Sequence, residues 1–168
     1  GGQGGGGRIA IYYTTNTYTG SINAMGITGK GGAGSIYLKP SSTNADLIIN
    51  NSKSSPIAYS TPISTSLTLN TLNITGGSYA ILSAGLTVTT FNLTQSQLDI
   101  TTGSISPTNA YLVSATIDNN VSYGFNATNL EISLGTNTLS SLRNSTFNAS
   151  NVTVKAGAIA THKTNSNA

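Results

Sequence analysis

The sequence predicts an all-β protein and, within that class, a β-solenoid of the parallel β-helix type. The first observation is composition: Ser, Thr, Asn and Gly supply 87 of the 168 residues, whereas charged residues make up only 7%. An ordinary helical or α/β enzyme carries about a quarter charged residues, so this composition disfavours both classes. Second, no apolar i, i+3, i+4, i+7 pattern continues for three helical turns. Third, the second half of the chain repeats a pattern that joins alternating apolar positions to turn residues.

The first third of the chain predicts separate strands joined by turns, within a single β-rich domain that spans residues 1–168. Residues 1–7 form a Gly-rich lead segment. Residues 8–13 read Arg-Ile-Ala-Ile-Tyr-Tyr, which is the composition of a strand. A second strand is expected at 35–39, where a proline stops it, and a third at 47–49.

The repeat region spans residues 66–157 and contains four copies of one pattern. Each copy has an apolar residue, then Asn-x-Ser/Thr, then two apolar residues separated by one position, and a Gly three residues later. A wide gap between the second and third copies leaves room for a hidden coil, marked by Asn109 and the apolar residues after it. At this unit length the chain would make about eight or nine coils. We expect equivalent turns of the coils to hold the Asn of each copy, namely Asn73, Asn92, Asn126 and Asn148.

Alternation within each copy predicts which side chains face the core, because successive side chains of a strand point to opposite faces. The residues between the apolar positions should point to solvent, namely Asp99, Glu131 and Thr153. A β-sandwich pilin-like subunit is the alternative fold, because its strands also recur about every 8–12 residues. In the solenoid we expect the following apolar residues to be buried: Leu98, Ile100, Leu130, Ile132, Val152 and Val154.

Three N-terminal segments resemble a module of large repetitive bacterial surface proteins. They are Gly-Gly-Gly-Gly-Arg-Ile-Ala-Ile-Tyr-Tyr (4–13), Gly-Gly-Ala-Gly-Ser-Ile-Tyr-Leu-Lys (31–39) and Leu-Ile-Ile-Asn-Asn (47–51). Proteins of that class are secreted, low in charge and thought to form parallel β-helices. The resemblance implies an extracellular structural or adhesive role, and it carries no catalytic residues.

No combination of residues predicts catalysis, a metal or a cofactor, so we expect a protein that is not an enzyme. The stretch Gly29–Gly34 fits G-x-G-x-x-G, but a strand follows it, whereas a dinucleotide site needs a helix there. His162 is the single histidine and lies in a polar tail at 160–168. The seven cations are scattered, which disfavours nucleic acid as a partner. No apolar run reaches the roughly 20 residues of a membrane span.

Eight Asn-x-Ser/Thr sequons leave two interpretations open. An Asn that recurs at one point of the repeat can stack its amide on the next Asn, or it can carry an N-linked glycan if the protein is secreted. The candidate glycosylation sites are Asn50, Asn73, Asn92, Asn120, Asn126, Asn144, Asn148 and Asn151.

A carbohydrate- or ice-binding adhesin module is a further alternative. It requires the same Thr or aromatic arrangement on one face of every coil. The pair formed by Thr87 and Thr89 does not recur at the repeat spacing of the sequence, and the eight Tyr residues show no regular arrangement either.

The leading hypothesis is a structural subunit of an extracellular filament or fibrous matrix at the cell surface. A solenoid without polar caps leaves strand edges open at both ends, which allows copies of the chain to stack end to end. The partners are then copies of the chain itself, with surface glycans as further candidates. A sandwich subunit would instead donate its 8–11 segment to a neighbour as a strand. The residues expected to mediate assembly are Arg8, Ile9, Ala10, Ile11, Val152, Val154 and Ile159.

Overall fold

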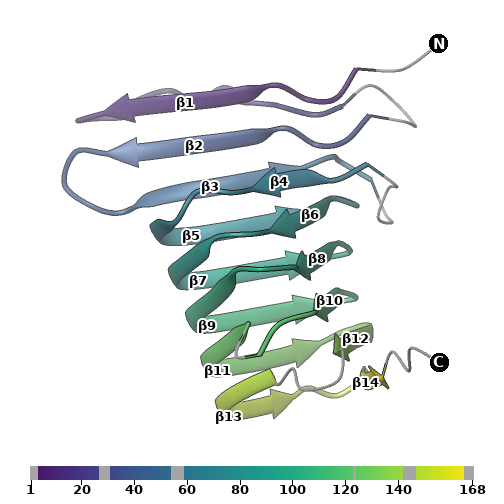
Figure 1. The fold of residues 1–168 in the computed structure, drawn as a ribbon. Coiled ribbons are helices and arrows are strands. Elements are labelled where there is room, and N and C mark those ends of the chain that lie inside the picture. Colours follow the sequence, from purple (N-terminus) through teal and green to yellow (C-terminus); the bar gives the residue numbers. More distant parts are fainter. Residues whose placement is uncertain (1–3, 27–30, 54–58, 123, 142–146, 165–168) are drawn as a thin grey trace.

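A computed structural model describes residues 4–26, 31–53, 59–122, 124–141 and 147–164, and all regular structure in these residues is β-strand. Fourteen strands form two sheets (Figure 1). Sheet A has the order β1-β2-β3-β5-β7-β9-β11-β13, and sheet B has the order β14-β12-β10-β8-β6-β4. The strands of sheet A are β1 (Arg8–Tyr13), β2 (Ser35–Pro40), β3 (Ala45–Asn50), β5 (Leu67–Thr75), β7 (Gly85–Thr94), β9 (Ser104–Val113), β11 (Phe125–Ser133) and β13 (Phe147–Val154). Those of sheet B are β4 (Thr61–Ile63), β6 (Tyr79–Leu82), β8 (Gln97–Ile100), β10 (Thr116–Asn119), β12 (Gly135–Ser141) and β14 (Ala158–Thr164).

From β3 onward, each coil is a strand of sheet A followed by a shorter strand of sheet B. Both sets pair in parallel with the corresponding strands of the next coil. Leu86 of β7 pairs with Leu67 of β5 and with Ile105 of β9, so one coil takes 19 residues here. The predicted β-solenoid is confirmed, and the β-sandwich alternative is wrong. Strand β9 is the hidden coil expected between the second and third copies of the repeat.

Each long strand of the central coils bends once, which gives the solenoid three faces. In β7 the buried residues are Leu86 and Val88, then Phe91 and Leu93, so two consecutive residues between these pairs stay outside the core. The same step recurs in β5, β9 and β11. Two arms of the long strand and one short strand therefore enclose an apolar core that runs along the coils.

The predicted alternation is confirmed in the interior coils and is wrong in the last coil. Val152 and Val154 of β13 are 58% and 53% exposed. In the described chain β13 is the final strand of sheet A, so no further coil covers these side chains. The buried apolar residues are Leu98, Ile100, Leu130 and Ile132, and the residues that stay outside the core are Asp99, Glu131 and Thr153.

The N-terminal third extends sheet A beyond the coils. Strand β1 pairs in parallel with β2, and β2 pairs antiparallel with β3, whereas sheet B ends at β4 (Figure 1). Sheet B has six strands, one for each coil, so the expectation of eight or nine coils is wrong. The residues before β3 build two additional strands of sheet A and the chain between them rather than closed coils.

Within the described part of the Gly-rich lead segment, Gly6 packs closely against the chain between β1 and β2. The N–H of Gly6 donates to the carbonyl oxygen of Gly32 at 2.9 Å. A Cβ atom on Gly6 would lie only 1.9 Å from the carbonyl oxygen of Ala24. Glycine is needed here because the two backbones approach each other so closely.

Candidate functional site

The C-terminal end of the solenoid exposes apolar side chains that continue the rows of the core. Val152 pairs with buried Leu130, and Val154 pairs with buried Ile132, in the neighbouring coil. Ile159 of β14 is 55% exposed as well, but it aligns with the exposed Thr136 of β12, so it lies on the outer face of sheet B and not on a row of the core. We call Val152, Val154 and Ile159 the C-terminal ridge. They are the three C-terminal residues expected to mediate assembly, and they lie on the strands that end the two sheets (Figure 1).

The four N-terminal residues expected to mediate assembly lie on β1, the opposite edge strand of sheet A. They divide between the two faces of this strand. Ile9 and Ile11 are half-buried, whereas Arg8 and Ala10 are exposed. Ala10 pairs with Tyr37, whose ring packs against the core. Because side chains alternate along a strand, Arg8 and Ala10 face the core side of sheet A and the two isoleucines face the other side.

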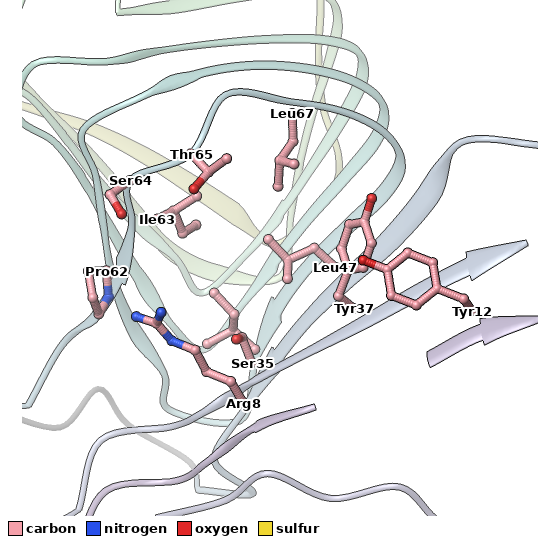
Figure 2. Close-up of a pocket in the computed structure, with 11 residues that line it drawn as sticks. Arg8, Tyr12, Ser35, Tyr37, Leu47, Pro62, Ile63, Ser64, Thr65 and Leu67 are labelled. Atoms are coloured by element: carbon pink, nitrogen blue, oxygen red, sulfur yellow. The ribbon is translucent and has the colours of Figure 1, made fainter. Parts of the chain in front are cut away.

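A pocket of about 310 Å³ opens at this N-terminal end, where sheet A continues beyond β4, the edge strand of sheet B at this end (Figure 2). Arg8 and Tyr12 of β1 and Tyr37 of β2 form its wall. The two tyrosine ring centroids are 6.1 Å apart, with the ring planes tilted by 59°. Sequence reasoning missed this pocket, because it exists only where the two sheets differ in their number of strands. The other lining residues are Ser35, Leu47, Ile49, Pro62, Ile63, Ser64, Thr65 and Leu67.

The repeated Asn residues do stack their amides, but not in a single column. Asn92 Nδ2 donates to Asn73 Oδ1 at 2.7 Å, and Asn148 Nδ2 donates to Asn126 Oδ1 at 2.8 Å. The two pairs belong to different columns, because Asn92 aligns with Tyr111 in the next coil.

A third column runs along the bend of the long strands. It joins Asn109, Asn129 and Asn151 through two amide hydrogen bonds of 2.9 Å each. The expectation that one column lies at equivalent turns is wrong, since all these residues lie within strands. The physical reason is that the motif spacing does not match the coil length between the two pairs. The aligned residues advance by 19 from β7 to β9 and by 20 from β9 to β11, which is 39 residues for two coils, whereas Asn126 follows Asn92 by only 34. The motif therefore lies five positions earlier on β11 than on β7.

The remaining sequons occupy different environments. Asn50 ends β3 and is exposed, whereas Asn120 follows β10 and is half-buried. Asn151 is exposed on the last coil, and its amide nitrogen donates to Asn129. Asn144 lies outside the described residues. Glycosylation of any of the eight sequons stays a prediction.

Two outward columns of small polar residues run along the first arm of the long strands. Thr87 pairs with Thr68 on one side and with Ser106 on the other, and the column continues on β11 and β13. Each of these strands carries a second small polar residue two positions later. The Thr pair formed by Thr87 and Thr89 does not itself recur, as expected, because Ser or Asn replaces at least one Thr at the aligned positions of the other coils. The second column consists of Asn70, Thr89, Thr108, Thr128 and Ser150.

The outer face of sheet B carries a hydrogen-bonded acidic cluster. Tyr79 Oη donates to Asp99 Oδ2 at 2.6 Å, and Gln97 Nε2 donates to Asp99 Oδ1 at 2.8 Å. Asp99 aligns with Asp118 of the next coil. The hydrogen bond to Asp99 raises the pKa of Tyr79 to about 12, and burial and the negative charges of the two aspartates add to this effect. Across the described residues, no three His, Cys, Asp or Glu side chains gather as metal ligands.

Comparison with known proteins adds no functional assignment. The chain matches no protein-family model, no curated protein and no solved structure. Within the described ranges, no helix has the length and apolar character that a membrane span needs. Function is therefore inferred from the two ends of the solenoid and from its outer faces.

Proposed function

We propose that this protein is a non-enzymatic structural subunit of an extracellular filament or fibrous surface matrix, and that copies of it stack end to end. The observation that carries the proposal is the C-terminal ridge. Its three side chains are each more than half exposed, although Val152 and Val154 align with inward positions of the preceding coil. An apolar ridge beside open strand edges is typical of a surface that receives a partner.

Strand edges at the two ends support stacking with a fixed polarity. Strand β13 is one edge of sheet A and β1 is the other. Strand β1 runs antiparallel to β13, because β2 and β3 pair antiparallel whereas the other neighbouring strands of the sheet pair in parallel. An antiparallel β1–β13 pair between copies would make sheet A continuous. A head-to-tail contact of this kind does not close on itself and generates a fibre.

Apolar burial supplies the driving force for this contact. Burying one Val or Ile side chain contributes about 1.5–3 kcal/mol, so the ridge offers several kcal/mol against the cost of association. Charges contribute little, because Lys155 beside the ridge already lies 3.0 Å from Glu131. We therefore expect assembly to be nearly independent of salt.

The proposed location is the cell exterior, and the proposed partners are copies of the same chain. The support is the resemblance of residues 4–13, 31–39 and 47–51 to secreted surface proteins, together with the low charge.

Sedimentation velocity over a range of protein concentrations tests the proposal. The wild-type chain should form large species as concentration rises, and negative-stain micrographs should contain filaments. A Val152→Asp/Val154→Asp variant should stay monomeric with an unchanged circular dichroism spectrum, because both side chains are exposed in the single chain. The matched control, Thr87→Asp/Thr89→Asp, changes an exposed pair far from both ends and should assemble normally. Monomeric wild-type protein at every concentration, or normal assembly of the ridge variant, would contradict the proposal.

The two outward polar columns favour a second candidate, an ice-binding adhesin module. Residues equivalent to Thr87 and Thr89 repeat from coil to coil at about 4.8 Å, which makes a regular array of small polar groups. This candidate predicts that the wild-type chain inhibits ice recrystallisation and that Thr87→Asp/Thr89→Asp abolishes the inhibition. If the wild-type chain does not inhibit recrystallisation, ice binding is excluded.

A further inference from the structure

The N-terminal pocket has the features of a small-molecule site rather than of a packing defect. Its volume of about 310 Å³ lies near the lower end of the range for ligand pockets. Its floor includes Leu47, Ile49 and Ile63, which are buried in the core, while polar groups lie around its opening (Figure 2). An apolar floor with a few polar groups around it is the usual plan of a small-molecule site.

The charge of the pocket is positive. Among the described residues that line it, Arg8 is the only charged one. Asp46 of the adjoining β3 is turned away, because its neighbour Leu47 faces the core and its carboxylate accepts a hydrogen bond from Asn70 at 3.1 Å. In Figure 2 the Arg8 side chain extends across the pocket toward Pro62. A guanidinium without a neighbouring acid suits a carboxylate, which it can bind through two parallel hydrogen bonds.

The aromatic wall defines the shape of the ligand. Tyr12 is 73% exposed, although it is one of the largest side chains of the molecule. It lies beside Tyr37 in a tilted pair, so one ring supports the position of the other. An aromatic ring of this kind packs against the C–H face of a sugar, and its phenol group remains free to form a hydrogen bond. Hydroxyl groups of Ser35, Ser64 and Thr65 lie around the same opening.

We propose that the N-terminal pocket binds a short stretch of an acidic polysaccharide whose sugar units carry carboxylates, such as uronic acid units. Arg8 and Tyr12 lie four residues apart on β1, or about 13 Å, so they contact different sugar units. Arg8 pairs with the carboxylate of one unit, Tyr12 stacks on the ring of another, and the hydroxyl groups of the rim bind sugar hydroxyls. The site is complete in one copy of the chain, so it does not depend on filament formation. Because β1 is also the edge that stacking would cover, the glycan would bind the unassembled subunit or the free N-terminal end of a filament.

Binding and stacking can be measured separately. Strand β1 carries Arg8 and Tyr12 and is also the edge proposed to meet the next copy. The Val152→Asp/Val154→Asp variant changes the opposite end and keeps every pocket residue. Binding is therefore measured in this variant as well as in the wild-type chain, and failure of the pocket proposal is distinguishable from failure of the filament proposal.

Isothermal titration calorimetry with acidic trisaccharides tests the site. The probes are trisaccharides of galacturonic, glucuronic and mannuronic acid, and each is compared with its methyl ester, which keeps the rings and removes the charge. At least one acid should bind with a stoichiometry of one, and its ester should bind at least tenfold more weakly. Arg8→Gln should weaken binding of the acid roughly tenfold, and Arg8→Lys should weaken it less. Tyr12→Ala should also weaken binding, whereas Lys155→Gln, which removes a cation at the other end, should leave it unchanged.

Three results would overturn the proposal. The first is that no acidic trisaccharide binds at millimolar concentration. The second is equal affinity for an acid and its ester, which would mean that the carboxylate is not recognised. The third is unchanged affinity in Arg8→Gln with the wild-type circular dichroism spectrum retained, since the charge would then play no part.

Discussion

The coil formed by β7 and β8 and the coil formed by β13 and β14 share one plan but differ in their surroundings. Phe91 and Leu93 of β7 are fully buried. Val152 and Val154 occupy the equivalent positions of β13, through successive pairings across β9 and β11, and both are more than half exposed. The difference shows that burial in this fold comes from the adjacent coil and not from the alternation of a strand alone.

This comparison explains why the two ends of the molecule are the places to look for interactions. In the interior, each coil is covered on both sides, and the outward residues on the first arm of the long strands are small and polar. At the C-terminal end no further coil of the described chain covers the core, so the C-terminal ridge is exposed. At the N-terminal end sheet A continues with β2 and β1, whereas sheet B ends at β4. The core side of β1 and β2 is therefore not covered by sheet B, and the pocket opens there.

The largest expected effect is a difference in core truncation between the two coils. Phe91→Ala should lower the free energy of unfolding by about 3–5 kcal/mol, because it leaves a cavity between covered coils. Val152→Ala should lower it by less than about 0.5 kcal/mol in the dispersed subunit, because this side chain is largely in water already. Urea denaturation at low protein concentration measures both values. Equal losses in the two variants would show that the last coil is covered in solution.

A smaller loss of stability is expected from substitutions in the Asn column at the bend, and it should differ between Asn129 in the middle and Asn151 at the end. Asn129 accepts a hydrogen bond from Asn151 and donates one to Asn109, whereas Asn151 takes part in only the first of these. Asn129→Ala should cost about 1–2 kcal/mol of unfolding free energy and Asn151→Ala about half as much. The same denaturation experiment checks the order, and a larger loss for Asn151→Ala would contradict it.

The acidic cluster of sheet B gives an effect of about 1 kcal/mol with a defined pH dependence. Tyr79→Phe removes the hydrogen bond to Asp99 and should destabilise the chain by about 1 kcal/mol at neutral pH. The pKa of Tyr79 is raised from 10.0 to about 12 in the folded chain. The corresponding stabilisation is therefore fully present below pH 10 and is lost as the pH rises toward 12.

Ultraviolet titration of the tyrosines measures this shift. Tyr79 should ionise late, near pH 12. The late phase should be missing in Tyr79→Phe and unchanged in the control Tyr111→Phe, which lies on sheet A. A late phase that persists without Tyr79 would assign it to another residue.

The smallest expected effect concerns the ion pair between Lys155 of the last coil and Glu131 of the coil before it. Lys155 and Glu131 lie 3.0 Å apart, with side chains 55% and 28% exposed. Lys155→Gln should change the unfolding free energy by about 0.5 kcal/mol or less, and the change should shrink further in high salt. A loss above about 1 kcal/mol would mean that this pair is shielded by another copy of the chain.

The sequence carried enough information for the local features of the fold. Alternation around Leu98 and Ile100 predicted their burial because it depends only on the period of a strand. The hidden coil at β9 was predicted from the wide gap between the second and third copies of the repeat. The bend within the long strands was not predicted. At the bend two consecutive side chains stay outside the core, and no single residue type marks this position in the sequence.

The features that depend on counting strands across the whole molecule could not be predicted. Asn126 carries the same motif as Asn92, yet the two lie in different columns, because 34 residues separate them whereas the two intervening coils take 39. Tyr12 and Tyr37 become neighbours only because β1 pairs with β2 beyond the end of sheet B. Val152 and Val154 follow the inward pattern, and their exposure depends on a coil that would come after them.

The axial repeat of the assembled material tests the central claim most directly. If copies stack end to end through sheet A, each contributes eight strands of this sheet at about 4.8 Å, or about 38 Å of filament length. Fibre diffraction from oriented wild-type filaments should therefore contain a 4.8 Å reflection along the filament axis and an axial repeat of about 38 Å. Filaments in which the 4.8 Å direction runs across the axis would mean that the subunits associate through their sides, and would contradict end-to-end assembly.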